Sequence, residues 1–144
     1  MSFKVRRLPG EPIVIVALQD AGELTPPHLP QLVADAVIAA CSEVSGHIYR
    51  IMDLRAITRH PERIAEFTDQ EMLALPGTAS DPRIVTLIVL GHAVPSNEDA
   101  AHLLELFDAF SAGVYHTVQD AVAHARDLAA RERGAPTPGS DVTL

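Results

Sequence analysis

Hydrophobic residues along the chain follow two spacings, and the change from one to the other marks the elements. Alternating or continuous apolar runs predict strands at residues 3–8, 13–18, 47–54, 84–90 and 114–116. Apolar residues at helical spacing predict helices at about residues 27–44, 61–75, 96–110 and 119–133. Thr117, three residues before Asp120, predicts the cap of the last helix. The order β-β-α-β-α-β-α-β-α predicts a layered α/β domain with a mostly parallel five-stranded sheet and helices packed on it.

The first two strands are separated by Pro9-Gly10-Glu11-Pro12, which predicts a hairpin and therefore an antiparallel strand at the N-terminal edge of the sheet. The first strand alternates and is expected to be half exposed. The strands at 13–18 and 84–90 are apolar at nearly every position and are expected to be buried on both faces. We expect one domain over residues 1–134 and a disordered tail over 135–144, where two prolines and a glycine interrupt any periodicity.

Composition narrows the class of protein. The 144 residues are 47% hydrophobic and 21% charged, which is typical of a folded globular domain. A net charge of −8 argues against nucleic acid or an anionic membrane as a partner. The apolar run at 13–18 is far shorter than the ~20 residues of a membrane span and has no cleavage site after it. With Cys41 as the single cysteine, we expect a reducing, cytoplasmic location.

Several local stretches carry a family resemblance. They are the N-terminal hairpin, Ile51–Arg55, the strand Ile84–Leu90 followed by Gly91, and Val114–Ala121 leading into the last helix. Together they resemble the SpoIIAA-like (STAS-like) fold of anti-sigma-factor antagonists and of the cytoplasmic domains of sulfate transporters, over residues 3–133. The resemblance implies a non-enzymatic regulatory module that acts through contact with a protein partner, such as a regulatory kinase.

In that family a serine or threonine at the start of the helix after the Asp-Leu strand is phosphorylated, and its state decides whether a kinase is bound. The corresponding place here reads His60-Pro61-Glu62-Arg63, so the phosphoacceptor serine motif is missing. Thr58 is the one nearby hydroxyl and is the candidate for phosphorylation. The fold is therefore expected to carry over, whereas the phosphorylation switch is not.

The carboxyl edge of the predicted sheet is where parallel α/β proteins place their ligands. The polar residues expected to gather there are Asp53, Arg55, Arg59, His60, Glu62, His92 and, less directly, His116. Residues 50–63 also hold four arginines against two carboxylates in an acidic chain. Guanidinium groups bind phosphate or carboxylate oxygens, so the alternative function is a small anionic-ligand-binding protein or an enzyme, with His92 as a proton carrier. The competing interpretation is that these arginines are solvated surface residues.

Motifs for catalysis are missing from the sequence. His60, His92 and Asp53 have side chains suited to zinc or iron, but the histidines are scattered singly along the chain, and we expect no metal or cofactor. Cys41 falls on an apolar helix face, where a thiol is usually inert, and no Gly-x-Ser-x-Gly elbow or phosphate-binding glycine loop is present. A wide apolar arc on the third predicted helix predicts a homodimer, unless all of it faces the core; its members are Leu103, Leu106, Phe107 and Phe110.

Overall fold

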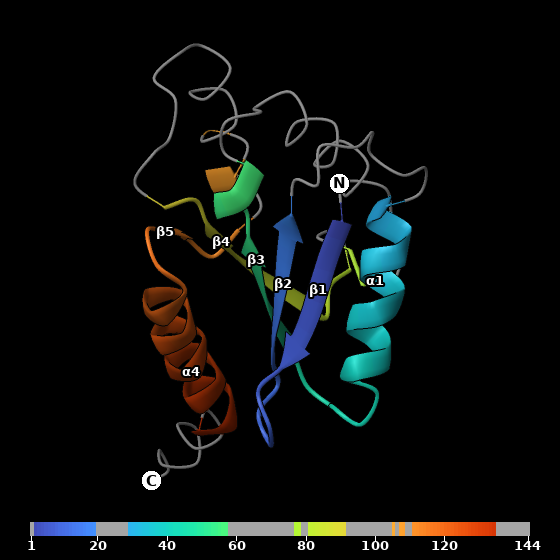
Figure 1. Cartoon of the computed structure of the whole chain (residues 1–144). Helices are drawn as coiled ribbons and strands as arrows, with labels where there is room; N and C mark the ends of the chain where they lie inside the picture. Colours follow the sequence, from blue (N-terminus) through green and yellow to red (C-terminus); the bar gives the residue numbers. More distant parts are fainter. Residues whose placement is uncertain are drawn as a thin grey trace, which may run out of the picture.

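The computed structural model describes residues 2–19, 29–57, 77–78, 81–91, 105, 107–108 and 111–134 (Figure 1). Its elements are β1 (Ser2–Arg7), β2 (Ile13–Gln19), α1 (Leu29–Ala40), β3 (Ile48–Asp53), the 3-10 helix η1 (Arg55–Ile57), β4 (Ile84–Val89), β5 (Val114–Tyr115) and α4 (Val118–Gly134). The helices predicted at 61–75 and 96–110 lie almost entirely outside the described residues, as does the predicted tail at 135–144. Of the third predicted helix, Glu105, Phe107 and Asp108 are described, and they are helical.

The five strands form one sheet in the order β1-β2-β3-β4-β5. β1 is antiparallel to β2, and β2, β3, β4 and β5 are parallel to one another. This confirms the α/β class, the mixed sheet and the antiparallel first strand. The carboxyl ends of the parallel strands lie at one edge of the sheet, together with the beginning of β1.

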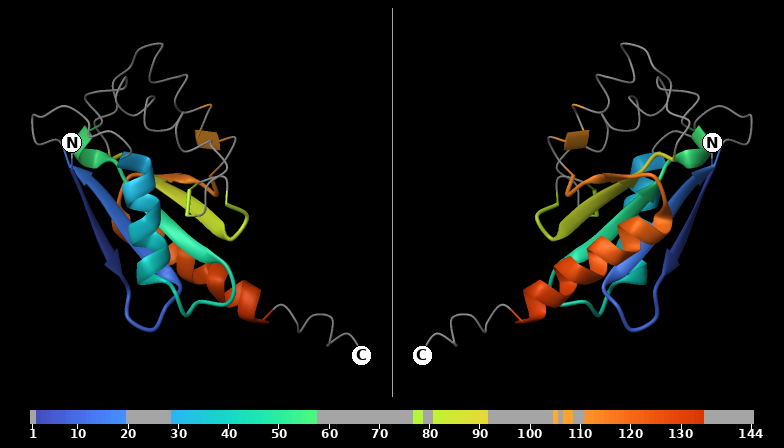
Figure 2. Two further views of the ribbon diagram at one scale, coloured as in Figure 1. Left: turned by 90° about the vertical axis from the view of Figure 1, so that its right-hand side faces the viewer. Right: turned by 90° about the vertical axis from the view of Figure 1, so that its left-hand side faces the viewer.

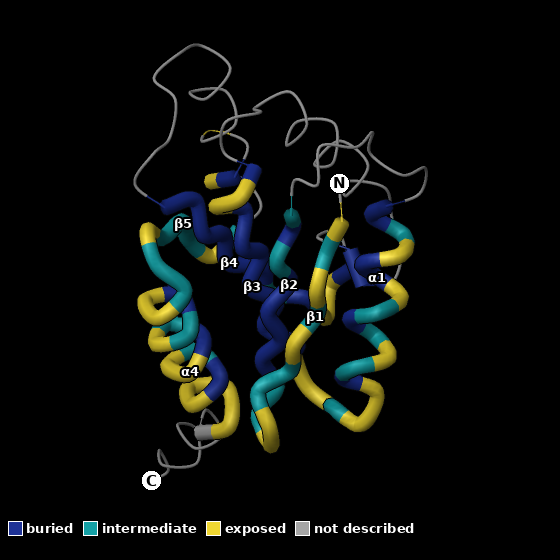
Figure 3. The backbone as a smooth tube through the Cα atoms, viewed as in Figure 1, coloured by how far each residue is buried: buried dark blue, intermediate teal, exposed yellow. Residues whose placement is uncertain are grey.

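The two described helices cover opposite faces of the sheet (Figure 2). Successive residues of a strand point to opposite faces, so each strand supplies two sets of side chains. On β2, Val14, Val16 and Leu18 pack in the cluster with α1, whereas Ile13 and Ile15 pack in the cluster with α4. β2 and β4 are apolar at almost every position and are largely buried on both faces, as their continuous runs predicted. β3 is buried along its whole length as well, and Figure 3 shows the burial concentrated in these three strands.

Helix α1 packs through Leu29, Val33 and Val37, which lie one turn apart on a single buried stripe. The helix ends at Ala40 rather than near the predicted Val44. The Arg7 side chain stabilises this C-terminal end of the helix, because its Nη1 donates to the Ala40 carbonyl oxygen at 3.0 Å. Cys41 follows immediately and is buried, and burial raises the pKa of its thiol. This placement agrees with an inert packing role.

Helix α4 begins with Thr117 as its cap, as predicted, since Thr117 Oγ1 accepts a hydrogen bond of 3.1 Å from the Asp120 amide. Ala121, Ala125 and Ala129 are all buried against the sheet. These small residues let the helix lie close to the strands. Arg126 makes a bidentate ion pair with Glu11 of the β1–β2 turn, with nitrogen-to-oxygen distances of 2.8 and 3.1 Å, and so links the middle of the helix to the hairpin.

The loop before β4 is organised by the buried carboxylate of Asp81. It accepts hydrogen bonds from the amides of Gly77 and Arg83 at 2.8 and 2.9 Å, and from the Arg83 guanidinium at 2.9 Å. The hydrogen bond from the Arg83 side chain, helped by the two amides, lowers the pKa of Asp81 from 3.8 to about 2. The ionised form is therefore the one that the folded protein stabilises.

This carboxylate gives a pH-dependent prediction. Because the pKa is lower in the folded than in the unfolded protein, the stabilisation is present above the ordinary pKa of aspartate and is lost as the pH falls towards 2. We expect Asp81→Asn to lower the free energy of unfolding by about 1 to 2 kcal/mol at neutral pH. Urea unfolding of both proteins should show this difference shrinking between about pH 5 and about pH 2. A difference that stays constant over that range would contradict the assignment.

No helix of the described chain has both the length and the apolar character needed to cross a membrane.

Candidate functional site

A groove of about 360 Å³ opens on the α4 side of the sheet, at the carboxyl edge. Its walls come from both sheet and helix. It is lined by Lys4 and Arg6 of β1, Ile15 and Ala17 of β2, Asp53 at the end of β3, Arg55 of η1, and Val118 and Gln119 at the start of α4. We call this the β1–α4 groove.

The groove exists because α4 crosses the sheet obliquely. Its contacts with β3, β4 and β5 are more extensive than those with β2, and Arg126, in the middle of the helix, binds Glu11 of the β1–β2 turn. The α4-side faces of β1 and β2 therefore remain open near the start of the helix. The strand register places Lys4 beside Ala17 and Ala17 beside Asp53 in one row across the sheet. The small side chain of Ala17 leaves space in the middle of that row.

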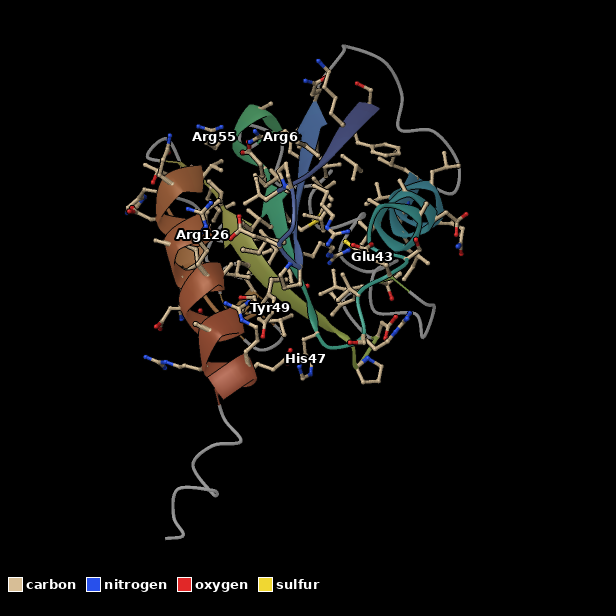
Figure 4. The ribbon with its side chains drawn as sticks, turned by 90° about the horizontal axis from the view of Figure 1, so that it is seen from below. Arg6, Glu43, His47, Tyr49, Arg55 and Arg126 are labelled. Carbon is tan, nitrogen blue, oxygen red and sulfur yellow. The ribbon has the colours of Figure 1, made fainter. Side chains whose placement is uncertain are left out.

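The charges of the groove are unbalanced. Lys4, Arg6 and Arg55 supply three cations against the single carboxylate of Asp53, in a chain whose net charge is −8. Lys4 and Arg6 are both exposed. Their side chains make no hydrogen bond or ion pair with any other residue that the structure describes. Figure 4 shows Arg6 and Arg55 on the same side of the sheet, towards α4.

Asp53 holds Arg55 in a fixed orientation. Arg55 Nε and Nη2 donate to the two carboxylate oxygens of Asp53 at 2.8 Å each, and the Arg55 amide also donates to Oδ1 at 3.2 Å. This pairing raises the pKa of Arg55 above its ordinary value. The Arg55 side chain is 51% exposed, against 12% for Asp53, so the carboxylate is covered while the guanidinium reaches solvent. A bidentate pair of this kind fixes the plane of the guanidinium.

The far wall of the groove is the first turn of α4, at Val118 and Gln119. The amides of a first helical turn have no partner within the helix, and the positive end of the helix dipole lies there. Thr117 satisfies the amide of Asp120, at the end of that turn. His116 lies just before the helix, with its Nδ1 at 2.9 Å from the Gly91 carbonyl oxygen. The groove thus combines side-chain cations with a helix terminus of the same electrostatic sign.

A second and larger hollow, of about 480 Å³, lies at the opposite edge of the sheet. Most of its charged groups are already paired. Arg7 binds Glu43 across one side, and His47 binds Glu132 across the other. The hydrogen bond from His47 lowers the pKa of the Glu132 carboxyl. We therefore place the candidate site in the β1–α4 groove, where Lys4 and Arg6 have no such partner among the residues that the structure describes.

Three of the residues predicted to gather at the carboxyl edge are described, and all three lie there. Asp53 and Arg55 form part of the groove wall, and His116 directly follows β5. The other predicted residues lie outside the described residues, so the structure does not place them; they are Thr58, Arg59, His60, Glu62 and His92. Among the described residues, no group of three or more His, Cys, Asp or Glu side chains is arranged to hold a metal ion.

Arg50 requires a correction. The sequence grouped it with the arginines of residues 50–63 as one basic stretch at the edge, but its side chain is buried on the α1 side of the sheet and is 1% exposed. It donates to Thr86 Oγ1 at 3.2 Å and to the Gly77 carbonyl oxygen at 3.4 Å. The reason is the strand period of two, which turns Arg50 and Asp53 to opposite faces. Of the arginines in that stretch that the structure describes, Arg50 therefore lies in the core and Arg55 in the groove.

Lys4 and Arg6 are the residues of the groove that the sequence analysis missed. A signal for them was present, because two cations spaced two apart on a strand must share a face. On the opposite face of the same strand, Phe3 and Val5 pack against the α1-side core.

Phe107, one of the residues proposed to form a dimer surface, is buried in that same core and is 1% exposed.

Fold and site together define an α/β protein with a mixed five-stranded sheet and a basic groove at its carboxyl edge. Comparisons with protein-family models, curated proteins and solved structures yield no significant match to this chain.

Proposed function

We propose that this protein is a non-enzymatic binding module, with a regulatory role, that recognises an anionic group in the β1–α4 groove. The observation that carries the proposal is the pair Lys4 and Arg6, exposed cations without partners among the described residues, beside an Arg55 guanidinium that Asp53 orients. In an acidic chain such a concentration of positive charge selects for carboxylate or phosphate oxygens.

Binding is favoured over catalysis by the kind of groups that converge. Of the described residues lining the groove, none carries a hydroxyl, thiol or imidazole. What they offer is ion pairing, hydrogen-bond donation and one carboxylate that is already occupied by Arg55. The second candidate, an enzyme or small-ligand site that continues through Arg59, His60 and His92, shares this anion-binding chemistry and is supported by the position of Arg55 at the carboxyl edge.

The same proposal includes a STAS-like fold for this chain and a regulatory protein as its partner. Support for the fold relationship comes from the sequential strand order with an antiparallel first strand, and from Asp53-Leu54-Arg55 at the end of β3. A regulatory partner would bring its anionic group to the groove as an acidic or phosphorylated side chain. Phosphorylation of Thr58 remains a separate prediction.

The proposal predicts a specific response to inorganic phosphate. Titration followed by amide NMR should move the amide signals of Val118 and Gln119, because these residues line the helix side of the groove at the first turn of α4. Arg6→Ala should weaken phosphate binding about fivefold, as expected for losing roughly 1 kcal/mol of charge-assisted hydrogen bonding. The affinity should also fall with rising salt.

Arg131→Ala is the matched control, because it removes the same charge from an exposed position of α4 outside the groove. It should leave phosphate affinity within about a factor of two, since Arg131 does not line the groove, is paired with Asp127, and acts on the groove only through the screened general charge of the protein. Equal losses for the two variants would show that only the general charge of the protein matters, and the groove would not be a site.

A further inference from the structure

The outer side of β1 is an open sheet edge. β1 pairs with β2 on one side, and no described strand pairs with its other side. Figures 1 and 2 show it at the margin of the sheet, next to α1 on one face. A strand in this position presents unpaired amides and carbonyls to any extended segment that approaches it.

The hydrogen-bond register identifies which groups point outward. Leu8 donates to the Ile13 carbonyl oxygen at 3.0 Å, so this pair is one of the hydrogen-bonded pairs of the hairpin. In an antiparallel ladder such pairs recur at every second residue. Arg6 and Lys4 therefore bond inward to β2, opposite Ile15 and Ala17. The amides and carbonyls of Phe3, Val5 and Arg7 are then the ones that face outward.

The two faces of β1 carry side chains of different chemistry, one basic and the other apolar. Lys4 and Arg6 point to the β1–α4 groove, whereas Phe3 and Val5 pack against the α1-side core. A strand added to this edge would continue both faces of the sheet. Its side chains next to Lys4 and Arg6 would lie in the non-hydrogen-bonded pairs of an antiparallel addition, which bring side chains closest together.

We propose that the edge of β1 docks an extended acidic segment of a partner protein by strand addition. Alternate Asp or Glu side chains of the segment would pair with Lys4 and Arg6 and reach towards Arg55. The residues between them would be apolar and would extend the face formed by Phe3 and Val5. Main-chain hydrogen bonds supply affinity in this mode of recognition, and the alternating side chains supply specificity. The inference rests on the proposed function and names the partner of that site.

The same cations argue against a second copy of the chain as the occupant. Pairing two β1 edges would place Lys4 and Arg6 of one copy against the same residues of the other. Like charges directly opposite on neighbouring strands are destabilising. Lysine and arginine on an edge strand are also a known means of preventing self-association. An acidic segment converts this repulsion into attraction, and charge complementarity therefore selects it over a homodimer through β1.

The probe is a short acetylated peptide in which glutamate and valine alternate, labelled with fluorescein and followed by fluorescence anisotropy on the full chain. Reversing both groove cations, with Lys4→Glu and Arg6→Glu, should weaken peptide binding at least about tenfold. A peptide in which lysine replaces glutamate should not bind. Arg131→Ala should bind the original peptide like the unmodified protein, since that side chain is outside the groove.

Two changes test the strand addition itself. Val5→Pro removes one outward amide without removing a bond to β2, a replacement that edge strands accommodate. It should weaken the peptide about tenfold and leave phosphate binding unchanged. N-methylation of alternate amides of the peptide should have a similar effect. Because that change leaves the protein untouched, it stays informative if Val5→Pro disturbs folding.

The outcomes of these experiments distinguish the proposed anion site in the groove from the proposed strand addition at the edge of β1. If the N-methylated peptide binds as tightly as the original while the charge reversals abolish binding, strand addition is overturned and the anion site stands. If the charge reversals change neither peptide nor phosphate binding, both proposals are overturned. Equal binding of the lysine peptide would overturn the acidic partner. Loss of peptide binding on N-methylation, with phosphate binding intact, supports the proposal.

Discussion

Replacing Gly77 with alanine is expected to lower the free energy of unfolding by about 3 kcal/mol, from a left-handed backbone penalty and a forced shift of the helix behind it. Gly77 has a φ of +84°, which residues with a side chain adopt at a cost. A Cβ at this position would lie 2.6 Å from the Ala34 carbonyl oxygen and 3.0 Å from Ile38 Cγ1. Both atoms belong to α1, so the helix itself would have to move.

Gly10→Ala is the matched control for this prediction. Gly10 has a similar φ of +74°, but a Cβ there would meet no atom within 4 Å. It should therefore cost only the backbone penalty of about 1 to 2 kcal/mol. Urea unfolding followed by circular dichroism measures both changes. Equal losses for the two variants would contradict the close approach between Gly77 and α1.

The second large effect is expected at Arg50. Arg50→Ala should lower the free energy of unfolding by about 3 kcal/mol, because it leaves buried acceptors without a donor and opens a cavity in the core. These acceptors include Thr86 Oγ1 and the Gly77 carbonyl oxygen. Arg50 therefore links the middle of β3 to β4 and to the Gly77 turn that packs on α1.

Two further variants isolate the cause of that loss. Arg50→Met restores most of the volume without the charge, so it should recover the part due to the cavity. Arg131→Ala, an exposed arginine paired one helical turn away with Asp127, should change the free energy of unfolding by less than about 0.5 kcal/mol. If Arg50→Ala were as mild as Arg131→Ala, the buried position of Arg50 would be wrong.

The elements that the sequence predicted well are those fixed by local patterns. The hairpin follows from two apolar runs around Pro9-Gly10-Glu11-Pro12, and the start of α4 follows from the Thr117 cap. The position of Asp53 and Arg55 also follows, because the carboxyl ends of parallel strands meet at one edge. In each case residues close together in sequence determine the outcome.

The features that the sequence did not predict depend on contacts between distant elements. Alternation places Lys4 and Arg6 on one face of β1, but only the oblique path of α4 leaves that face open. In the same way, an arginine within an apolar strand is compatible with either a surface or a buried position. The covering of that face by α1 and the hydrogen bonds to Thr86 and Gly77 decide in favour of burial.

The central claim, that the β1–α4 groove is an anion site, is tested most directly by one comparison. The dissociation constant for inorganic phosphate is measured by amide NMR for the unmodified chain and for the variant carrying both Lys4→Glu and Arg6→Glu, at the same ionic strength. We predict a loss of at least about tenfold, together with loss of the shifts at Val118 and Gln119. Unchanged affinity, with the same amides still responding, would contradict the claim.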